Sequence, residues 1–139
     1  RTRPARLTFV DGQARHVMLQ AHAAAVTSGT ATLEACLMRC PTVLVYIASR
    51  VTYWIGRWLI KGVKHLGLAN IIAGREVMPE LIQDAFTPQR LADQLQRYLT
   101  DADARAQTLT ALDETNALLG TGDASTRAAD AIVSAVAGQ

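Results

Sequence analysis

The chain has 139 residues, of which half are apolar and 19% are charged, and this balance excludes an intrinsically disordered protein. Its net charge of +2 gives no indication of a nucleic-acid partner. No apolar run reaches the roughly 20 residues that span a bilayer, and the sequence predicts no signal peptide.

The first part of the chain alternates between short apolar runs and helical patterns. Residues 7–10 are rich in strand-forming types and end at an Asp-Gly turn, which favours a strand. A helix is predicted over residues 13–22, a short buried strand over 23–27 and a second helix over 31–39. Residues 41–47 are continuously apolar and β-branched, which is typical of a strand covered on both faces of a parallel sheet.

The second part of the chain is mostly helical. Residues 51–65 predict a strong helix, residues 66–74 a loop, and residues 77–82 a short apolar segment around a proline. Thr87 and Pro88 form an N-cap followed by proline at the first helical position, which marks a helix start. Three helices are predicted here, over residues 88–99, over residues 103–119 and from residue 123 onward.

This order of elements predicts an α/β fold: a partial Rossmann-like, doubly wound parallel sheet with a helical C-terminal tail. Complete domains of this type have more strands in front, and the chain begins at Arg1 rather than Met, so we expect a segment that begins inside a domain. Residues 1–100 are expected to form a partial nucleotide-sugar-binding domain. Residues 101–139 are expected to form helices that pack on it or on a partner.

The first candidate site lies in Thr27-Ser-Gly-Thr-Ala-Thr-Leu-Glu34, where a strand ends and a helix begins. The free N–H groups and the dipole of a helix N-terminus bind phosphate, and glycine allows close backbone approach. Ser28 and Thr30 add hydroxyl groups, and Glu34 lies one turn further on, where a carboxylate can accept ribose hydroxyls. The alternative interpretation is an ordinary Ser/Thr cap followed by a solvated glutamate.

The second candidate site lies in the segment 70–83, in a loop near the carboxyl ends of the strands. Asn70 can donate and accept hydrogen bonds, Gly74 permits close approach, and Arg75 can bind phosphate or carboxylate with two parallel hydrogen bonds. The pattern alone favours the alternative, a surface loop with an Arg–Glu ion pair.

The third candidate is an amphipathic helix with an aromatic face and a basic face. Trp54 and Trp58 share the first face, while Arg57, Lys61 and Lys64 share the second. Such a helix can lie in a membrane interface and attract anionic lipid. A helix that packs its tryptophans on the sheet explains the same pattern equally well.

Cysteine and histidine residues give no metal or catalytic pattern. Cys36 and Cys40 are four residues apart on a predicted helix and are expected to be buried and reduced. The three histidines have no usable spacing, so the sequence predicts no metal site and no cofactor.

Five segments together resemble the lipid-A-disaccharide synthase family. They are Asp11–Met18, Ser28–Ala35, Asn70–Glu76, Pro79–Gln83 and Gly122–Ala131. The similarity covers nearly the whole chain. Ser-Gly-Thr-Ala-Thr-Leu-Glu is fairly specific on its own, and its combination with the Asn/Ala-Gly-Arg-Glu loop and Pro-Glu-Leu, in this order, is strongly specific.

The resemblance implies the C-terminal half of a GT-B glycosyltransferase, with the active site between two Rossmann-like domains. The family transfers diacylglucosamine from UDP to a monosaccharide phospholipid, with inversion and without a metal, to make the lipid A disaccharide precursor of Gram-negative bacteria. It implies a cytoplasmic location, peripheral to the inner membrane. The acceptor site and the candidate base are expected in an N-terminal domain that this sequence lacks, so the catalytic residues are unknown and the fragment is expected to be inactive alone.

The resemblance also implies roles for individual residues. The expected UDP-binding set is Ser28, Gly29, Thr30, Glu34, Asn70, Gly74 and Arg75, and the expected lipid-facing set is Trp54, Arg57, Trp58, Lys61 and Lys64. Within the first set, the Ser-Gly-Thr residues would meet the diphosphate and the glutamate would meet the ribose. Ala69 departs from the proline that is usual in the family, so the loop before Asn70 is expected to be less rigid than in other members.

Two other functions fit the same features. A non-catalytic nucleotide-binding or interaction module would carry the donor motif without an acceptor domain, and another GT-B enzyme of the UDP-GlcNAc epimerase type would share the glycine loop and the glutamate. Apolar residues on the last helix and the edge of a truncated sheet predict a homo-oligomer, or exchange of elements between chains.

Overall fold

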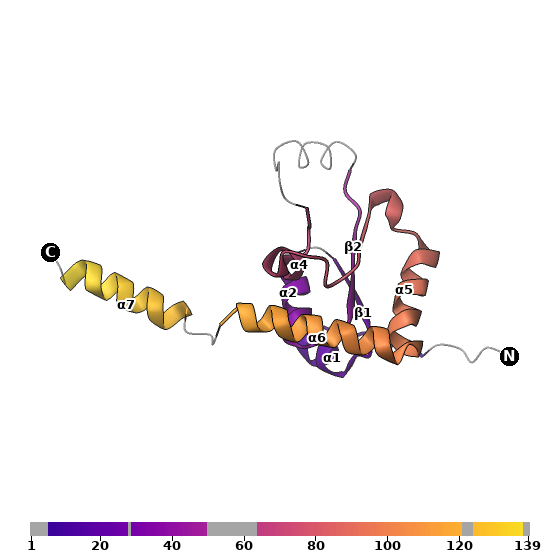
Figure 1. Ribbon diagram of the computed structural model, residues 1–139, viewed down its shortest axis with the longest axis horizontal. Coiled ribbons are helices and arrows are strands. Elements are labelled where there is room, and N and C mark those ends of the chain that lie inside the picture. Colours follow the sequence, from indigo (N-terminus) through magenta and orange to yellow (C-terminus); the bar gives the residue numbers. More distant parts are fainter. Residues whose placement is uncertain (1–5, 28, 50–63, 121–123, 138–139) are drawn as a thin grey trace.

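The computed structural model describes residues 6–27, 29–49, 64–120 and 124–137. Its elements, in chain order, are α1 (Ala14–Gln20), β1 (Ala24–Thr27), α2 (Thr30–Leu37), β2 (Thr42–Tyr46), α4 (Leu68–Ala73), β3 (Glu80–Ile82), the 3₁₀ turn η1 (Gln83–Ala85), α5 (Pro88–Thr100), α6 (Ala102–Leu118) and α7 (Ala124–Ala137). Figure 1 shows helices on both sides of the strands. The predicted α/β class, a partial Rossmann-like fold with a helical tail, is therefore confirmed.

The sheet has three parallel strands in the order β1-β2-β3. Its register pairs Val26 with Leu44 and Val45 with Leu81. Helices α2 and α4 cover one face and α5 covers the other (Figure 1). The central strand β2 is buried at Thr42, Val43 and Leu44, as its continuous apolar sequence predicts for a strand covered on both faces.

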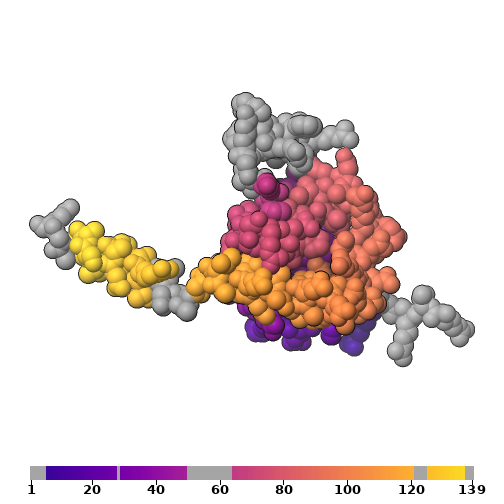
Figure 2. Space-filling model, in the orientation of Figure 1, coloured from indigo at the N-terminus to yellow at the C-terminus, as the bar shows by residue number. Residues whose placement is uncertain are grey.

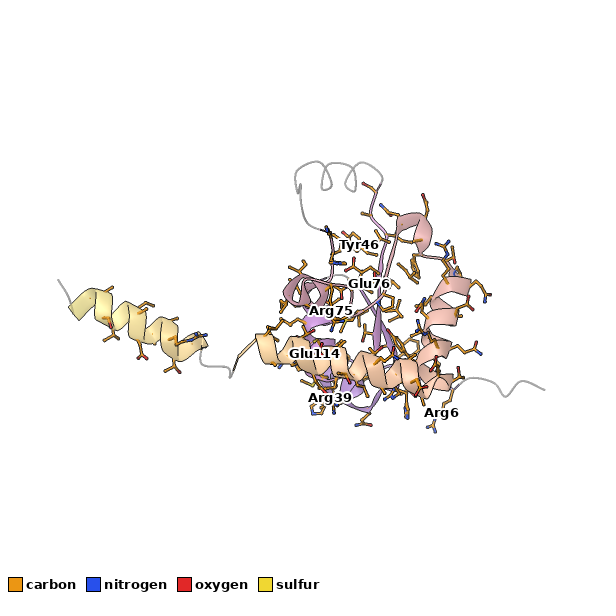
Figure 3. The ribbon with its side chains drawn as sticks, viewed as in Figure 1. Arg6, Arg39, Tyr46, Arg75, Glu76 and Glu114 are labelled. Carbon is orange, nitrogen blue, oxygen red and sulfur yellow. The ribbon has the colours of Figure 1, made fainter. Side chains whose placement is uncertain are left out.

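Helix α6 packs against α2, α4 and α5, and it lies across the front of the molecule in Figure 2. Two ion pairs fasten it: Arg39 to Asp113, with Nε to Oδ1 at 2.7 Å, and Arg75 to Glu114, with Nη2 to Oε2 at 2.6 Å (Figure 3). Helix α7 instead extends away from the other elements, as Figures 1 and 2 both show.

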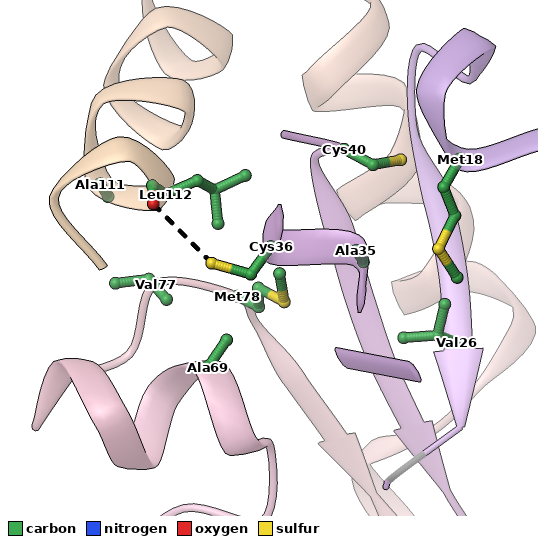
Figure 4. Close-up of a cluster of buried hydrophobic side chains, with 10 residues drawn as sticks. All are labelled: Met18, Val26, Ala35, Cys36, Cys40, Ala69, Val77, Met78, Ala111 and Leu112. Atoms are coloured by element: carbon green, nitrogen blue, oxygen red, sulfur yellow. Dashed lines mark hydrogen bonds between the residues drawn. The ribbon is translucent and has the colours of Figure 1, made fainter. Parts of the chain in front are cut away.

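The first hydrophobic core fills the space between the sheet and α1, α2, α4 and α6 (Figure 4). Its buried members are Met18, Val26, Ala35, Cys36, Cys40, Ala69, Val77, Met78, Ala111 and Leu112. Helix α6 therefore supplies part of a core that begins with α1. The second core, under α5, joins Val43, Leu81 and Tyr98.

Both cysteines are buried and free, as the sequence predicts. Burial, helped by the nearby carboxylate of Asp113, raises the pKa of the Cys36 thiol from 9.0 to about 11. Burial also raises the pKa of Cys40. Both thiols are therefore protonated near neutral pH and act as small core side chains rather than nucleophiles.

The prediction of a strand over residues 7–10 is wrong. These residues have no regular secondary structure, and Phe9 is 90% exposed. A strand needs a neighbouring backbone for its hydrogen bonds, and no described strand pairs with this segment. The third strand is instead β3, inside the segment 77–82, where the sequence showed only a short apolar piece.

The prediction of a loop over residues 66–74 is also wrong, because residues 68–73 form α4. Gly74, one of the expected donor-site residues, has a φ of 65° and ends this helix, a conformation that favours glycine. The predicted helix over 51–65 lies mostly outside the described residues. Its last two, Lys64 and His65, have no regular secondary structure.

The cap predicted for α5 is confirmed, whereas α6 begins at Ala102, one residue before the predicted start at Asp103, after a cap that the sequence analysis did not name. The Thr87 hydroxyl accepts a hydrogen bond from Arg90 N at 3.2 Å, with Pro88 at the first helical position. Asp101 caps α6 by accepting from Ala104 N at 2.9 Å. Among the described helices, none combines the length and the apolar character that crossing a membrane requires.

Candidate functional site

The candidate site begins where β1 ends. Thr27 is the last residue of β1, and α2 begins at Thr30, so the connection lies at the carboxyl edge of the parallel sheet. Ligands of open α/β folds bind at this edge. Gly29 and Thr30 are exposed there, which leaves the start of α2 accessible.

Gly29 has a backbone conformation that requires glycine. Its φ is 129° and its ψ is −157°, a region that other residues essentially do not occupy. The sequence motif therefore has a glycine where the backbone needs one. As N-cap of α2, Gly29 directs the chain so that the first turn of the helix begins at the edge of the sheet, with its unpaired N–H groups at that end.

Glu34 lies one turn along α2 from Thr30, as the sequence predicts. Its Oε1 is 3.3 Å from Nη2 of Arg15 on α1, and its side chain is 30% exposed. This carboxylate is accessible, and a ligand that binds it would replace only a weak surface ion pair. Gly29 thus caps α2, Thr30 is its first residue, and Glu34 follows one turn further on.

Asn70 is almost fully buried, and all its hydrogen-bonding capacity is used inside the chain. Its Oδ1 accepts from the backbone N–H groups of Val77 at 2.8 Å and Met78 at 2.9 Å. Its Nδ2 donates to Met78 O and to Glu80 Oε1, both at 2.8 Å. These four bonds fold the segment between α4 and β3 against α4. In this structure the side chain has no capacity left for a ligand.

Glu80 is a central residue of this region that sequence reasoning missed. Its carboxylate accepts hydrogen bonds from the backbone N–H groups of Leu66 and Gly67, and its side chain is 6% exposed. His65 Nδ1 lies 3.8 Å from Oε1. Glu80 therefore fixes the backbone that enters α4. The only signal in the sequence was a charged residue at the edge of an apolar run.

Arg75 lies away from the glycine loop. It pairs with Glu114 on α6 (Figure 3). The residue before Glu114, Asp113, pairs with Arg39, which follows the C-terminal end of α2. Gly29 stands at the opposite end of the same helix. Arg75 also lines a polar hollow of about 190 Å³ between the loop before β3, α5 and α6. Its contact with the donor stays a prediction.

Gln83 also occupies the carboxyl edge of the sheet, and the sequence analysis did not single it out. Its φ is 53°, which is uncommon for a residue other than glycine. Its side-chain amide accepts from Ala48 N at 3.2 Å and donates to Ala48 O at 3.1 Å. This contact continues the pairing of β2 with β3 beyond the last strand residue.

The remaining predicted site residues fall largely outside the described part of the chain. They are Ser28, Trp54, Arg57, Trp58 and Lys61. Lys64, the last residue of the predicted basic face, is described and is exposed.

Comparison with known proteins identifies relatives that match most of the chain. A family model described as Lipid-A-disaccharide synthetase matches residues 2–136. The chain is 44% identical to the lipid-A-disaccharide synthase of Myxococcus xanthus over 125 residues, or 90% of the chain and 32% of that protein. It is 43% identical to that of Geobacter metallireducens over 117 residues, or 84% of the chain and 30% of that protein. The chain thus spans about a third of the length of these relatives.

Proposed function

Because the chain belongs to the lipid-A-disaccharide synthetase family, we propose that it forms the donor-binding part of a lipid glycosyltransferase. The proposed donor is a UDP-linked diacylglucosamine and the acceptor a monosaccharide phospholipid, joined with inversion to give the lipid A disaccharide precursor. The acceptor site and the base belong to other parts of such an enzyme, so this chain alone is expected to bind the donor nucleotide without transferring the sugar.

The observation that carries this proposal is the backbone of Gly29. A glycine-only conformation at the end of β1 leaves the first turn of α2 open at the carboxyl edge of the sheet. The N–H groups and dipole at that end suit a diphosphate without any cationic side chain. Thr30 adds a hydroxyl, and Glu34, one turn away, suits the ribose hydroxyls.

Replacing Glu34 with alanine tests the nucleotide site. Hydrogen bonds to a charged group contribute about 1.5–3 kcal/mol, so UDP affinity should fall roughly 10- to 100-fold, as measured by calorimetric titration. Loss of the exposed Arg15 pair should change the free energy of unfolding by less than about 1 kcal/mol. Binding and folding therefore separate in this variant.

Asp113→Ala is the matched control, because it also removes an exposed carboxylate paired with an arginine, here Arg39, which follows the C-terminal end of α2. It should leave UDP affinity unchanged within about twofold. Equal UDP affinity in the Glu34→Ala variant and the unsubstituted chain would remove Glu34 from the site. A folded, unsubstituted chain that does not bind UDP at all would contradict the proposed function.

We also propose that the chain associates with itself through α7. Ile132, Val133 and Val136 on this helix are 65%, 65% and 73% exposed, and burying such apolar side chains favours association. Light scattering after size exclusion should give a mass above 15.0 kDa, the mass of one chain. Changing the three residues to serine should restore the single-chain mass. A monomer at all concentrations would overturn this proposal.

A location at the cytoplasmic face of the inner membrane is proposed from the family, and the aromatic and basic pattern of the sequence supports contact with a membrane surface. Trp54 and Trp58 should insert among lipid headgroups while the neighbouring basic residues attract anionic lipid. The chain should sediment with anionic vesicles and less with neutral ones. Replacing both tryptophans with alanine should reduce sedimentation. Unchanged sedimentation in that variant would assign the tryptophans to the protein core.

A further inference from the structure

Thr32 stands at the third position of α2, and its side chain is fully buried. Its hydroxyl donates to the carbonyl oxygen of Gly29 at 2.9 Å. The same oxygen atom of Thr32 accepts the backbone N–H of Leu68 at 3.1 Å. One buried hydroxyl therefore connects the glycine loop with the start of α4.

The bond to Gly29 fixes the direction of a peptide group. In a trans peptide the C=O and the following N–H point in opposite directions. Because the Gly29 carbonyl is drawn toward the helix by both the hydroxyl and the backbone N–H of Thr32, the N–H of Thr30 points the other way, out of the helix end. That is the direction in which an anion at the edge of the sheet would lie.

The bond from Leu68 holds the hydroxyl in place. The backbone just before Leu68 is itself fixed, since Leu66 and Gly67 donate to the Glu80 carboxylate. A hydroxyl that accepts one hydrogen bond is polarised and donates a stronger second one. Hydrogen bonds thus run from Glu80 on β3, through the start of α4, to the carbonyl of Gly29.

Within the described residues, the other two buried threonines donate to carbonyl groups close by in sequence and make no such connection. Thr115, for example, donates at 2.7 Å to Ala111 O in the preceding turn of its own helix, a common local contact. Thr32 instead reaches the N-cap residue of α2 and accepts from a different helix. Its contacts exceed what stabilising one helix requires.

We propose that Thr32 is a positioning residue for the nucleotide site, which sets the Gly29–Thr30 peptide so that the Thr30 N–H faces the donor diphosphate. This inference rests on the proposed UDP-binding function and adds the residue that prepares the loop. Thr32 itself, being buried, does not touch the nucleotide.

Thr32→Val in the full 139-residue chain is the test, because valine keeps the shape and removes the hydroxyl. UDP affinity, measured by titration followed by amide NMR, should fall roughly three- to tenfold, the effect of one net hydrogen bond. The shift of the Thr30 amide on adding UDP should shrink, and the Leu68 amide should exchange faster in the free chain. Thr32→Ser, which restores the hydroxyl, should recover affinity to within about twofold.

Thr115→Val controls for the loss of any buried hydroxyl, and it should lower stability without changing UDP affinity. If Thr32→Val binds UDP as tightly as the unsubstituted chain, the positioning role is wrong while the proposed function stands. The same conclusion follows if Thr115→Val weakens binding equally. If the unsubstituted chain does not bind UDP, the proposed function fails, and the role of Thr32 fails with it.

Discussion

The Asn70→Ala variant is expected to lose about 3–5 kcal/mol of unfolding free energy. Alanine removes both donors and the acceptor of the side chain, which leaves the N–H groups of Val77 and Met78 and the carbonyl of Met78 without their partners. Glu80 loses a donor as well. Buried polar groups without partners each cost about 1–3 kcal/mol, so the losses approach the whole stability of a small domain. Urea denaturation followed by circular dichroism measures the change.

Asn116→Ala is the matched control, because this asparagine is half-buried and bonds only weakly to Cys36: its Nδ2 donates to the backbone O at 3.0 Å, and its Oδ1 accepts from the thiol Sγ at 3.3 Å. It should cost only about 1 kcal/mol. Equal losses of unfolding free energy in the two variants would show that the four hydrogen bonds of Asn70 do not stabilise the fold more than the contacts of Asn116 do.

Asn70→Asp sharpens the test. The new carboxylate would stand 2.8 Å from Glu80 Oε1 in place of the amide donor. Two carboxylates at this distance cannot both ionise, so one pKa of the pair is raised in the folded state. The variant should therefore be least stable near neutral pH, and it should gain stability relative to the unsubstituted chain as the pH falls from neutral towards about 4, the pKa of a carboxyl group in the unfolded chain. A difference that does not change with pH would contradict this account.

Gly29→Ala should have a large effect on the nucleotide site. No atom lies within 4 Å of an added Cβ, so the penalty comes from the backbone alone: a φ of 129° with a ψ of −157°. Forcing another residue into this region costs about 1–3 kcal/mol, and the loop is expected to relax to a different conformation. The peptide before Thr30 would then turn, and UDP affinity should fall more than about tenfold in calorimetric titration.

Gly120→Ala separates strain from function. Gly120 also has a positive φ, 74°, and open space around an added Cβ, but it follows α6 far along the chain. This variant should lose about 1 kcal/mol of stability and keep its UDP affinity. If both variants bind UDP like the unsubstituted chain, the conformation of Gly29 has no role in binding.

Local signals explain why much of the fold could be predicted from the sequence. The apolar run 41–47 indicated a doubly covered strand, and Thr87–Pro88 marked the start of α5, because both patterns act over a few neighbouring residues. The strand predicted at 7–10 failed for the opposite reason, since strand formation depends on a partner far away in sequence. Helix α4 was missed because its start is held by contacts with Thr32 and Glu80 rather than by a side-chain cap of its own.

The candidate site divides in the same way. The glycine loop and the carboxylate one turn later were visible as a contiguous motif, and in the structure Gly29 caps α2, Thr30 is its first residue and Glu34 follows one turn further on. That Asn70 makes all its hydrogen bonds within the chain could not be foreseen. The sequence does not distinguish an exposed asparagine from a buried one whose side chain is fully hydrogen-bonded. Thr32 was part of the motif, but its role depends on Leu68, 36 residues later.

The place of α6 in the first core has a consequence for how the chain is made. Leu112 packs into the same cluster as Met18, so residues from almost the two ends of the described body meet there. During synthesis, which runs from the N-terminus, the sheet and α2 emerge long before the side chains that cover them. The core can close only after α6 has left the ribosome. Until then the apolar side of α2, including Cys36, remains open to water and to chaperones.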